Sequence, residues 1–310
     1  MPHESSTRLT SRPVEPVTGD GLEGSFGVIV EGVDVREVDD GTFAELLDLL
    51  LAHRFVVLPD QDLSHEKYVA FARRWGRPLR LIQPKSRLEG FPEIIVQHNS
   101  EATPEPLRDR ASHWHCDSSY EAEVSTFTML YGVETPERGG VTRFADLVGT
   151  YEALPAGDRA RYDQMAVRHA TSAATPLEDE TIVRPQTLPE EYARDVELPD
   201  PVTHPLVATH PVNGRKALYG LGGSSYGIEE LSEQAGGDLL LDLRRHATAP
   251  RFCTGYRLMP RDVLIWDNFS VMHRATPARY SDAAGERRLN YRISVKGVPG
   301  EGVDAAGASA

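Results

Sequence analysis

The sequence predicts a mainly β protein with flanking helices, arranged as a sandwich or a barrel. From Ile94 onward the chain is dominated by short apolar segments of strand type at irregular spacing, which is typical of all-β sandwiches and barrels. Clear helical periodicity occurs mainly in the first 75 residues. Because the chain contains no internal repeat and no convincing linker, we expect one domain over residues 21–298.

Four segments near the start alternate between strand and helix patterns. Phe26–Val38 is rich in Val and Ile with period-two stretches, and Phe55–Leu58 is a short apolar run, so both are predicted strands. A capping-box pattern at Thr42–Glu45 opens a predicted helix. A second helix is predicted over Ser64–Trp75, since a glycine and a proline follow it. We interpret both helices as packing elements.

The rest of the chain is predicted to be strands with one insertion. Residues 147–201 are rich in Ala, Glu, Arg and Pro and are expected to form helix and loop, with helices over Tyr151–Leu154 and Gly157–Ala166. A further helix is predicted over Asp238–His246. Gly220–Ser225 is interpreted as a flexible loop, because it lacks the Gly-Lys-[Ser/Thr] ending of a phosphate-binding loop. The predicted strands are Ile94–His98, Phe127–Val133, Val202–Thr209, Ala217–Tyr219, Phe252–Leu258, Val263–Trp266 and Leu289–Val295.

The two ends of the chain lack the pattern of a folded element. Residues 1–20 are rich in Ser, Thr and Pro, and residues 299–310 are mostly Gly and Ala without periodicity. Both segments are expected to be disordered. The start lacks the apolar region of a signal peptide, and no run of about 18 apolar residues occurs, so no membrane segment is expected.

The charge balance argues against several classes of partner. Thirty-three Lys and Arg residues stand against 47 Asp and Glu residues, which gives a formal net charge of −14. Such a field repels nucleic acid and anionic membrane surfaces, so neither is expected to bind. Cys116 and Cys253 are too few for a disulfide framework, which favours a reducing compartment, the cytoplasm. Any small anion must therefore be bound by a local cluster of Arg or Lys.

The candidate chemistry begins with a His-x-Asp pair. In an extended segment His115 and Asp117 point to one face, while the residues beside them point away. Far downstream, His273 follows a buried strand and a turn. Two histidines and a carboxylate form the facial triad of non-haem Fe(II) sites. From spacing alone, a hydrogen-bonded loop histidine at position 273 and a turn capped by Asp267 explain the pattern equally well.

The last predicted strand adds positive charge. Arg288, Asn290 and Arg292 alternate with apolar residues, so one face packs into a core while the other presents two guanidinium groups and an amide. Arginine has the fork geometry that matches carboxylates. Four residues of strand separate the two arginine Cα atoms by about 13 Å, too far for one small carboxylate to reach both. We infer two anion sites, and the alternative is an outward-facing solvated strand.

Five motifs occur in order along the chain. They are Trp114-His115-x-Asp117, Gly139-Gly140-x-Thr142, Thr209-His210-Pro211 with Gly214-Arg215-Lys216-Ala217-Leu218-Tyr219, Trp266-Asp267-Asn268 with His273, and Arg287-Arg288 with Arg292. Together they resemble the TauD/TfdA family of Fe(II)/2-oxoglutarate-dependent dioxygenases. The resemblance extends from about Phe26 to Gly297. Five ordered motifs are far more specific than any one of them.

The resemblance implies a fold, a metal and a reaction. The fold is a double-stranded β-helix, a cupin-like jelly roll with iron at one open end. His115, Asp117 and His273 would bind Fe(II), with 2-oxoglutarate and O₂ as co-substrates. Oxidative decarboxylation of 2-oxoglutarate to succinate and CO₂ would be coupled to oxidation of a second molecule. Because related halogenases lack the carboxylate at position 117, its presence favours hydroxylation, with desaturation or oxidative cleavage as variants.

The resemblance also implies how the two organic molecules are held. Arg288 and Thr142 would bind the far carboxylate of 2-oxoglutarate. Arg292 matches the family arginine that binds the anionic group of the primary substrate, and Asn290 lies on the same face of the predicted strand. Extra residues between His273 and Arg288 leave a second register open, in which Arg287 takes the role of Arg288.

Two departures from the family pattern concern the primary substrate. Ala111 replaces a polar residue that contacts substrate in taurine-cleaving members, and residues 81–85 lack the histidine of an upstream loop. We therefore expect a small carboxylate, sulfonate or phosphonate that is larger or less polar than taurine. A zinc-dependent hydrolase or isomerase and a non-catalytic binding module are the alternatives. The resemblance further implies a possible homodimer or homotetramer.

Overall fold

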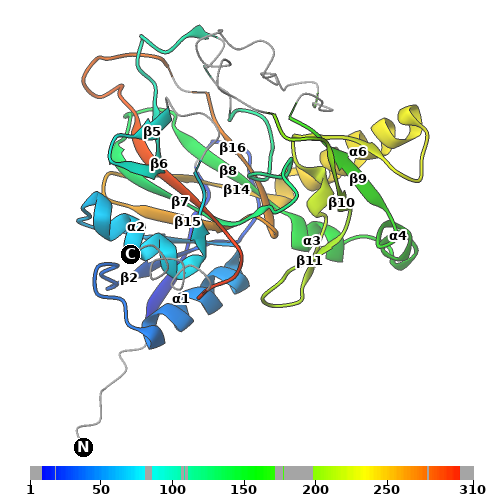
Figure 1. The fold of residues 1–310 in the computed structure, drawn as a ribbon, viewed down its shortest axis with the longest axis horizontal. Helices are drawn as coiled ribbons and strands as arrows, with labels where there is room; N and C mark the ends of the chain where they lie inside the picture. The colour runs from blue at the N-terminus through cyan, green and yellow to red at the C-terminus, as the bar shows by residue number, and fades with distance from the viewer. Residues whose placement is uncertain are drawn as a thin grey trace, which may run out of the picture.

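The largest element of the fold is a nine-stranded sheet, hereafter the main sheet (Figure 1). The computed structural model describes residues 9–17, 19–80, 86–105, 108, 111–171, 177, 198–277 and 279–300. The main sheet has the order β1-β2-β3-β15-β7-β17-β6-β5, with β4 paired to β17. Neighbouring strands are antiparallel except β2 and β3. Its strands are β1 (Thr10–Pro13), β2 (Val28–Glu31), β3 (Phe55–Leu58), β4 (Arg77–Pro78), β5 (Arg87–Leu88), β6 (Phe91–His98), β7 (Ser125–Glu134), β15 (Val263–Asp267) and β17 (Leu289–Lys296).

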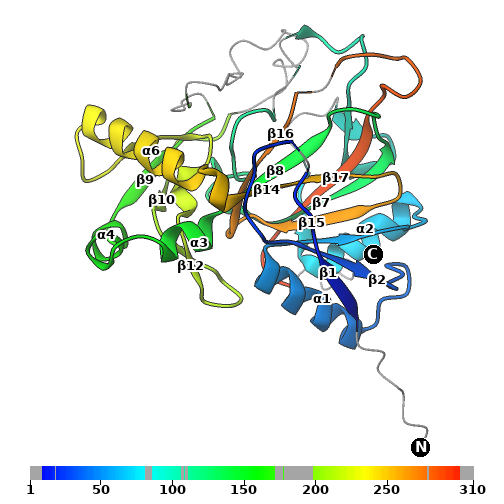
Figure 2. The ribbon, with the colours of Figure 1, turned by 180° about the vertical axis from the view of Figure 1, so that it is seen from behind.

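A second sheet of three strands, the minor sheet, faces the main sheet (Figure 2). Apolar side chains from both sheets meet between them. Phe55 of β3 stacks on Phe144 with ring centroids 4.5 Å apart, and Trp266 of β15 packs against Phe144 from the side. Two sheets that enclose one apolar interior form a β-sandwich, the class of architecture to which the predicted jelly roll belongs. The minor strands are, in order, β14 (Cys253–Arg257), β8 (Val141–Asp146) and β16 (Val271–Ala275).

Helices α1 (Asp40–His53) and α2 (His65–Trp75) cover the other face of the main sheet (Figure 1). Leu50 of α1 and Trp75 of α2 belong to the same buried cluster as Ile265 of β15. Trp266, the next residue of that strand, points into the jelly-roll interior instead. Because both faces of β15 are buried, its residues form a continuous apolar run.

The start of α1 differs from the prediction. The helix begins at Asp40, because the Asp39 side chain caps it by accepting a hydrogen bond from the N–H of Thr42 at 2.7 Å. The predicted N-cap, Thr42 of the capping box Thr42–Glu45, is therefore three residues too late. The second helix agrees with the prediction, since Ser64 is the N-cap and Gly76 follows its last residue.

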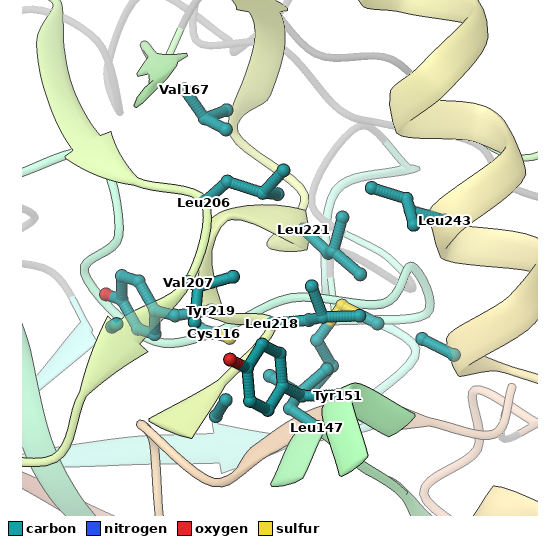
Figure 3. Packing of buried hydrophobic residues seen from close by; sticks show 14 of the residues in the cluster. Cys116, Leu147, Tyr151, Val167, Leu206, Val207, Leu218, Tyr219, Leu221 and Leu243 are labelled. Carbon is teal, nitrogen blue, oxygen red and sulfur yellow. The ribbon is translucent and has the colours of Figure 1, made fainter. Parts of the chain in front are cut away.

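A lobe beside the jelly roll is built from short strands and helices around a further apolar cluster (Figure 3). Figure 3 shows Cys116 among leucines of this cluster. Burial raises the pKa of the Cys116 thiol, so this cysteine is a packing residue. The lobe contains β9 (Ala166–His169), β10 (Val202–Pro205), β11 (Ala208–Thr209), β12 (Lys216–Ala217), β13 (Ser225–Ile228), α3 (Leu147–Glu152), α4 (Ala156–Tyr162), α6 (Glu233–Ala247) and the 3₁₀ turns η4 (Tyr219–Leu221) and η5 (Pro250–Phe252).

The predicted ends of the domain need one correction. Residues 1–20 were expected to be disordered, but Thr10–Pro13 form β1 and pair antiparallel with β2. The strand is stabilised by this pairing, which a local composition argument does not detect. Residues 301–310 of the predicted tail lie outside the described residues. Within the described part of the chain, no helix is long and apolar enough to cross a membrane.

Several predicted elements have different bounds in the structure. The strand predicted over Phe26–Val38 is confined to Val28–Glu31, because Gly27 and Gly32 adopt φ values of +88° and +78°, which interrupt an extended chain. The helix predicted over Gly157–Ala166 ends at Tyr162, and the helix predicted from Asp238 begins at Glu233. Strands β8 and β16 have no predicted counterpart. Of the predicted insertion, residues 172–176 and 178–197 lie outside the described residues.

Candidate metal centre

The edge of the minor sheet brings two histidines side by side. His273 lies in β16, and its backbone exchanges two hydrogen bonds with His115, with N to O distances of 3.0 and 2.9 Å. Residues paired in this way across an antiparallel ladder carry their side chains on the same face. The two imidazole ring centroids are accordingly 4.3 Å apart. His273 is thus a strand residue, not the loop residue that the spacing also allowed.

Asp117 completes the cluster from a turn. The predicted extended segment ends after His115, and the chain turns at Asp117. Its Oδ1 lies 3.7 Å from Nε2 of His115, and its Oδ2 lies 3.7 Å from Nε2 of His273. One ligand atom from each of the three residues lies within 4.8 Å of the others. Trp114 and Cys116 point away into the lobe, as predicted.

The protonation of the two histidines fits a metal. Nδ1 of His115 lies 2.8 Å from the carbonyl oxygen of His113, so Nδ1 carries a proton and Nε2 is the nitrogen that faces Asp117. Burial, and next the nearby His115, lower the pKa of His273 well below its usual value and keep the ring neutral. Two imidazoles whose Nε2 atoms face one buried carboxylate match the donor set of a divalent metal ion.

Arg292 links the main sheet to this cluster. Its guanidinium lies 2.6 Å from Oδ1 of Asp117, and a second hydrogen bond of 3.0 Å joins it to the hydroxyl of Ser294. Burial alone would raise the pKa of Asp117, but the guanidinium of Arg292 beside it holds that pKa below its usual range. Asp117 is therefore ionised, as metal ligation requires.

The alternation predicted for the last strand places the remaining β17 residues. Ile293 and Val295 pack under the outer helices, so Arg292 and Asn290 point to the opposite, interior side. Asn290 is buried but does not hydrogen-bond to the triad within the described residues. The outward alternative for this strand is therefore wrong.

Arg287 and Arg288 separate at the start of β17. Arg287 is half exposed and pairs with Glu134 at 3.3 Å on the surface. Arg288 is less exposed, and its backbone N–H donates to the side-chain oxygen of Asn99 at 2.6 Å. By alternation along the strand, Arg288 shares the face of Asn290 and Arg292. This placement favours Arg288 over Arg287 as the residue directed toward the interior.

Thr142 approaches from the minor sheet. It lies in β8 two residues before Phe144, which pairs with His273 and whose ring centroid is 6.3 Å from the His273 ring. Residues two apart on a strand share a face, so Thr142 also faces the interior, where it is 8% exposed. It does not hydrogen-bond to the triad within the described residues. Thr142 thus lies in the minor sheet, and Arg288 directly precedes β17 of the main sheet.

Two polar residues that the site reasoning did not assign a role contact Asp117. Thr128 of β7 donates to Oδ2 of Asp117 at 2.7 Å, and the side-chain oxygen of Asn268 accepts the backbone N–H of Asp117 at 3.3 Å. In the sequence, Thr128 stands out only as a polar residue inside a predicted strand whose other residues are mostly apolar. Its partner depends on the pairing of distant strands, which a local pattern does not reveal.

The segment Gly220–Ser225 packs directly behind the ligands. It was predicted to be a flexible loop near the mouth of the site, but it is buried and continues from η4 into β13. A Cβ atom on Gly223 would lie 2.4 Å from the ring of His113 and 2.9 Å from the carbonyl oxygen of Trp114. The glycine allows this close approach to the chain that carries His115.

Replacing Gly223 by Ala is expected to lower the free energy of unfolding by about 1–3 kcal/mol, the usual cost of overpacking. The backbone at Trp114 has to move, so the affinity for metal should fall as well. Gly237→Ala is the control, because no atom lies within 4 Å of that Cβ position in α6. The free energy of unfolding of Gly237→Ala should rise by about 0.5–1 kcal/mol, because Ala favours a helix more than Gly does. Denaturant titration of both variants checks the expectation, and equal midpoints would contradict it.

Comparison with known proteins identifies the family. Residues 13–293 match the family described as "Taurine catabolism dioxygenase TauD, TfdA family". The chain belongs to this family. The match covers all three triad residues and both candidate arginines, so the resemblance drawn from five motifs is confirmed.

Two characterised relatives of this TauD/TfdA protein are similar over nearly their whole length. The (S)-phenoxypropionate/alpha-ketoglutarate-dioxygenase of Sphingobium herbicidovorans is 30% identical over 281 residues, which cover 90% of this chain and 94% of the relative. The alpha-ketoglutarate-dependent 2,4-dichlorophenoxyacetate dioxygenase of Cupriavidus pinatubonensis is 30% identical over 288 residues, with coverage of 88% and 96%. The predicted enzyme class, a 2-oxoglutarate-dependent dioxygenase, is thereby confirmed.

Two solved structures share the fold of this family member. A taurine dioxygenase from Burkholderia xenovorans superposes with a TM-score of 0.72 at 27% identity and covers 94% of this chain and 91% of its own. The structure of AAD-2 in complex with Mn(II) and N-oxalylglycine has a TM-score of 0.70 at 27% identity, with coverage of 94% and 98%. These similarities support the jelly roll described above.

Proposed function

We propose that this dioxygenase binds Fe(II) through His115, Asp117 and His273. The observation that carries the proposal is the convergence of their ligand atoms within 4.8 Å. Fe(II), when bound, supplies the centre for O₂ activation and for decarboxylation of 2-oxoglutarate to succinate and CO₂. The chain supplies two neutral imidazoles and one ionised carboxylate, a ligand set that leaves coordination positions for co-substrates.

Arg288 and Thr142 are assigned to the far carboxylate of 2-oxoglutarate. Arg288 provides a positive charge and the fork geometry that suits a carboxylate, and the Thr142 hydroxyl provides a further donor. Arg288 directly precedes β17 of the main sheet and Thr142 lies in β8 of the minor sheet, so a carboxylate between them would lie inside the jelly roll. The complex of AAD-2 with N-oxalylglycine supports a site for a dicarboxylate in this fold.

Arg292 is assigned to the anionic group of the primary substrate, with Asn290 as a second polar contact. Because Arg292 reaches Asp117 from β17, an anion bound to it lies beside the metal ligands. Ala111 lies beside β16, where its carbonyl accepts the N–H of Ala275 at 2.7 Å, and it offers a methyl group instead of a polar side chain. The site therefore favours an anion with an apolar body.

We propose that this anion is an organic carboxylate, hydroxylated at a carbon near its charged group. The two relatives are named for phenoxypropionate and 2,4-dichlorophenoxyacetate, which are both carboxylates with an aromatic body. Their substrates support the same class here, while sulfonates and phosphonates belong in the same screen. We further propose a single dioxygenase domain over residues 21–298, a cytoplasmic location consistent with two free buried cysteines, and a homodimer or homotetramer.

Anaerobic addition of Fe(II) and 2-oxoglutarate to the purified protein should produce the weak visible charge-transfer band that the family resemblance implies. Zn(II) has filled d orbitals and should give no such band with the same ligands. Absorption difference spectra check the result, and no band with Fe(II) would contradict the proposed site. Screening carboxylates, sulfonates and phosphonates for substrate-dependent succinate formation then tests the substrate class. If taurine stimulates succinate formation and no carboxylate does, the proposed carboxylate substrate class is wrong.

A further inference from the structure

A buried polar network surrounds Asp117, and it extends beyond the proposed ligands. Thr128 and Asn268 are both fully buried, and both contact Asp117. Buried polar groups are costly unless their hydrogen bonds are satisfied, so a closed network at this depth needs an explanation. Thr128 lies in the middle of the main sheet, paired with Trp266 of β15 on one side and Ser294 of β17 on the other.

The hydrogen bonds of Thr128 have one consistent direction. The amide nitrogen of Asn268 donates to Oγ1 of Thr128 at 3.0 Å. The hydroxyl of Thr128 also lies 2.9 Å from the hydroxyl of Ser294. Because the ionised carboxylate can only accept, the single proton of Thr128 is directed to Oδ2 of Asp117 at 2.7 Å, and Ser294 donates to Oγ1 of Thr128. The oxygen of the Asn268 amide accepts the backbone N–H of Asp117 at 3.3 Å and the indole N–H of Trp266 at 3.1 Å. Asn268 therefore holds both the backbone of Asp117 and, through Thr128, its carboxylate.

The turn that carries Asn268 is itself fixed. Oδ1 of Asp267 accepts the N–H of Phe269 at 2.9 Å, and Oδ2 accepts the hydroxyl of Ser270. His210 approaches this carboxylate with Nε2 3.2 Å from Oδ1, and both side chains are buried. Nδ1 of His210 accepts the N–H of Val212, which places the ring proton on the nitrogen that faces Asp267. The motif that contains His210 and the motif that contains Asp267 therefore meet at this turn and hold it in place.

We propose that Thr128 and Asn268 are positioning residues that fix the Asp117 carboxylate in the orientation that binds the metal. A carboxylate rotates easily about its terminal bond, and in the observed orientation Oδ1 lies near His115 and Oδ2 near His273. Thr128 holds Oδ2, the oxygen that lies 3.7 Å from His273. The proposal rests on the metal site proposed above and adds two residues that do not bind the metal. Partners of this outer kind typically change metal affinity or activity by about 10–100-fold.

The test is a Co(II) titration of the full-length protein by calorimetry, without 2-oxoglutarate. Thr128→Val removes the hydroxyl at nearly constant shape and should weaken Co(II) binding about 10–100-fold. Thr128→Ser keeps the hydroxyl, so its Co(II) affinity should stay within about 3-fold of wild type, below that range. Asn268→Ala should weaken binding too. Both residues act through one carboxylate. The double variant should therefore lose less Co(II) binding free energy than the sum of the losses in the two single variants.

Tyr256→Phe is the matched control, because it removes another hydrogen bond to a buried carboxylate, from Tyr256 to Asp262 at 2.6 Å. It should lower the metal-free unfolding temperature and leave Co(II) affinity unchanged. Unchanged affinity in Thr128→Val would overturn the proposal, as would equal weakening in Thr128→Ser. If Thr128→Val does not fold, Asn268→Ala against Tyr256→Phe decides the question. Failure of wild type to bind Co(II), or no loss in His115→Ala, would instead overturn the metal site itself.

Discussion

Replacing His115 by Ala is expected to abolish succinate production. It should also weaken binding of Fe(II) or Co(II) more than any substitution of Thr128 or Asn268. The variant removes one of three ligands whose atoms lie within 4.8 Å. Loss of an outer partner costs about 10–100-fold in metal affinity, so loss of a ligand should exceed about 100-fold. Metal titration and a succinate assay at saturating 2-oxoglutarate measure the two effects.

The fold should survive this change. His115 is 19% exposed, and its backbone hydrogen bonds to His273 do not involve the side chain. The metal-free unfolding temperature should therefore remain close to that of wild type. His65→Ala is the control, because His65 begins α2 on the outer face of the main sheet. Its turnover should be unchanged, and normal turnover in His115→Ala would show that the triad is not the metal site.

Replacing Arg288 by Ala is expected to raise the Michaelis constant for 2-oxoglutarate, while Arg292→Ala raises that for the primary substrate. Hydrogen bonds to charged groups contribute about 1.5–3 kcal/mol each, so each constant should rise roughly 10–150-fold. Measuring both constants for both variants, with the second substrate saturating, separates the two roles. Arg292→Ala should also change metal affinity, because the guanidinium contacts Asp117.

Arg287→Ala provides the matched control for both arginines. It removes the same type of side chain one residue away, but this guanidinium is half exposed and pairs with Glu134. A surface pair of this kind contributes little, so both Michaelis constants should stay near the wild-type values. If the Michaelis constant for 2-oxoglutarate rises only in Arg287→Ala, Arg287 and not Arg288 binds the far carboxylate of 2-oxoglutarate. A rise of the same constant in both Arg288→Ala and Arg292→Ala would contradict two separate anion sites.

The bounds of an element were predicted best from the sequence where both of its faces are buried. Val263–Asp267 was predicted to within one residue, because both faces of that strand are covered and its residues form one apolar run. Strands β8 and β16 were missed, because Thr142, Arg143, His273 and Arg274 interrupt their apolar pattern. Both strands carry a candidate site residue, Thr142 in β8 and His273 in β16. The polar groups that a site needs are the same groups that hide its strands from a hydrophobic pattern.

The site itself was predictable only in part. His115, Asp117 and His273 were found as residue types at suggestive spacing, and family motifs supplied the roles of Arg288, Thr142 and Arg292. Their convergence depends on β16 pairing with His115, a contact between distant parts of the chain. Thr128 and Asn268 remained without a role, because their hydrogen bonds exist only once β7 and β15 are paired.

The backbone pairing of His115 with His273 also constrains how the protein acquires its metal during synthesis. When His115 and Asp117 have left the ribosome, the nascent chain offers only two ligands, and the third arrives near the end of translation. A two-ligand site holds a divalent ion weakly, so tight binding at the proposed site requires that β16 has paired with the segment of His115. Metal binding is thereby coupled to completion of the minor sheet.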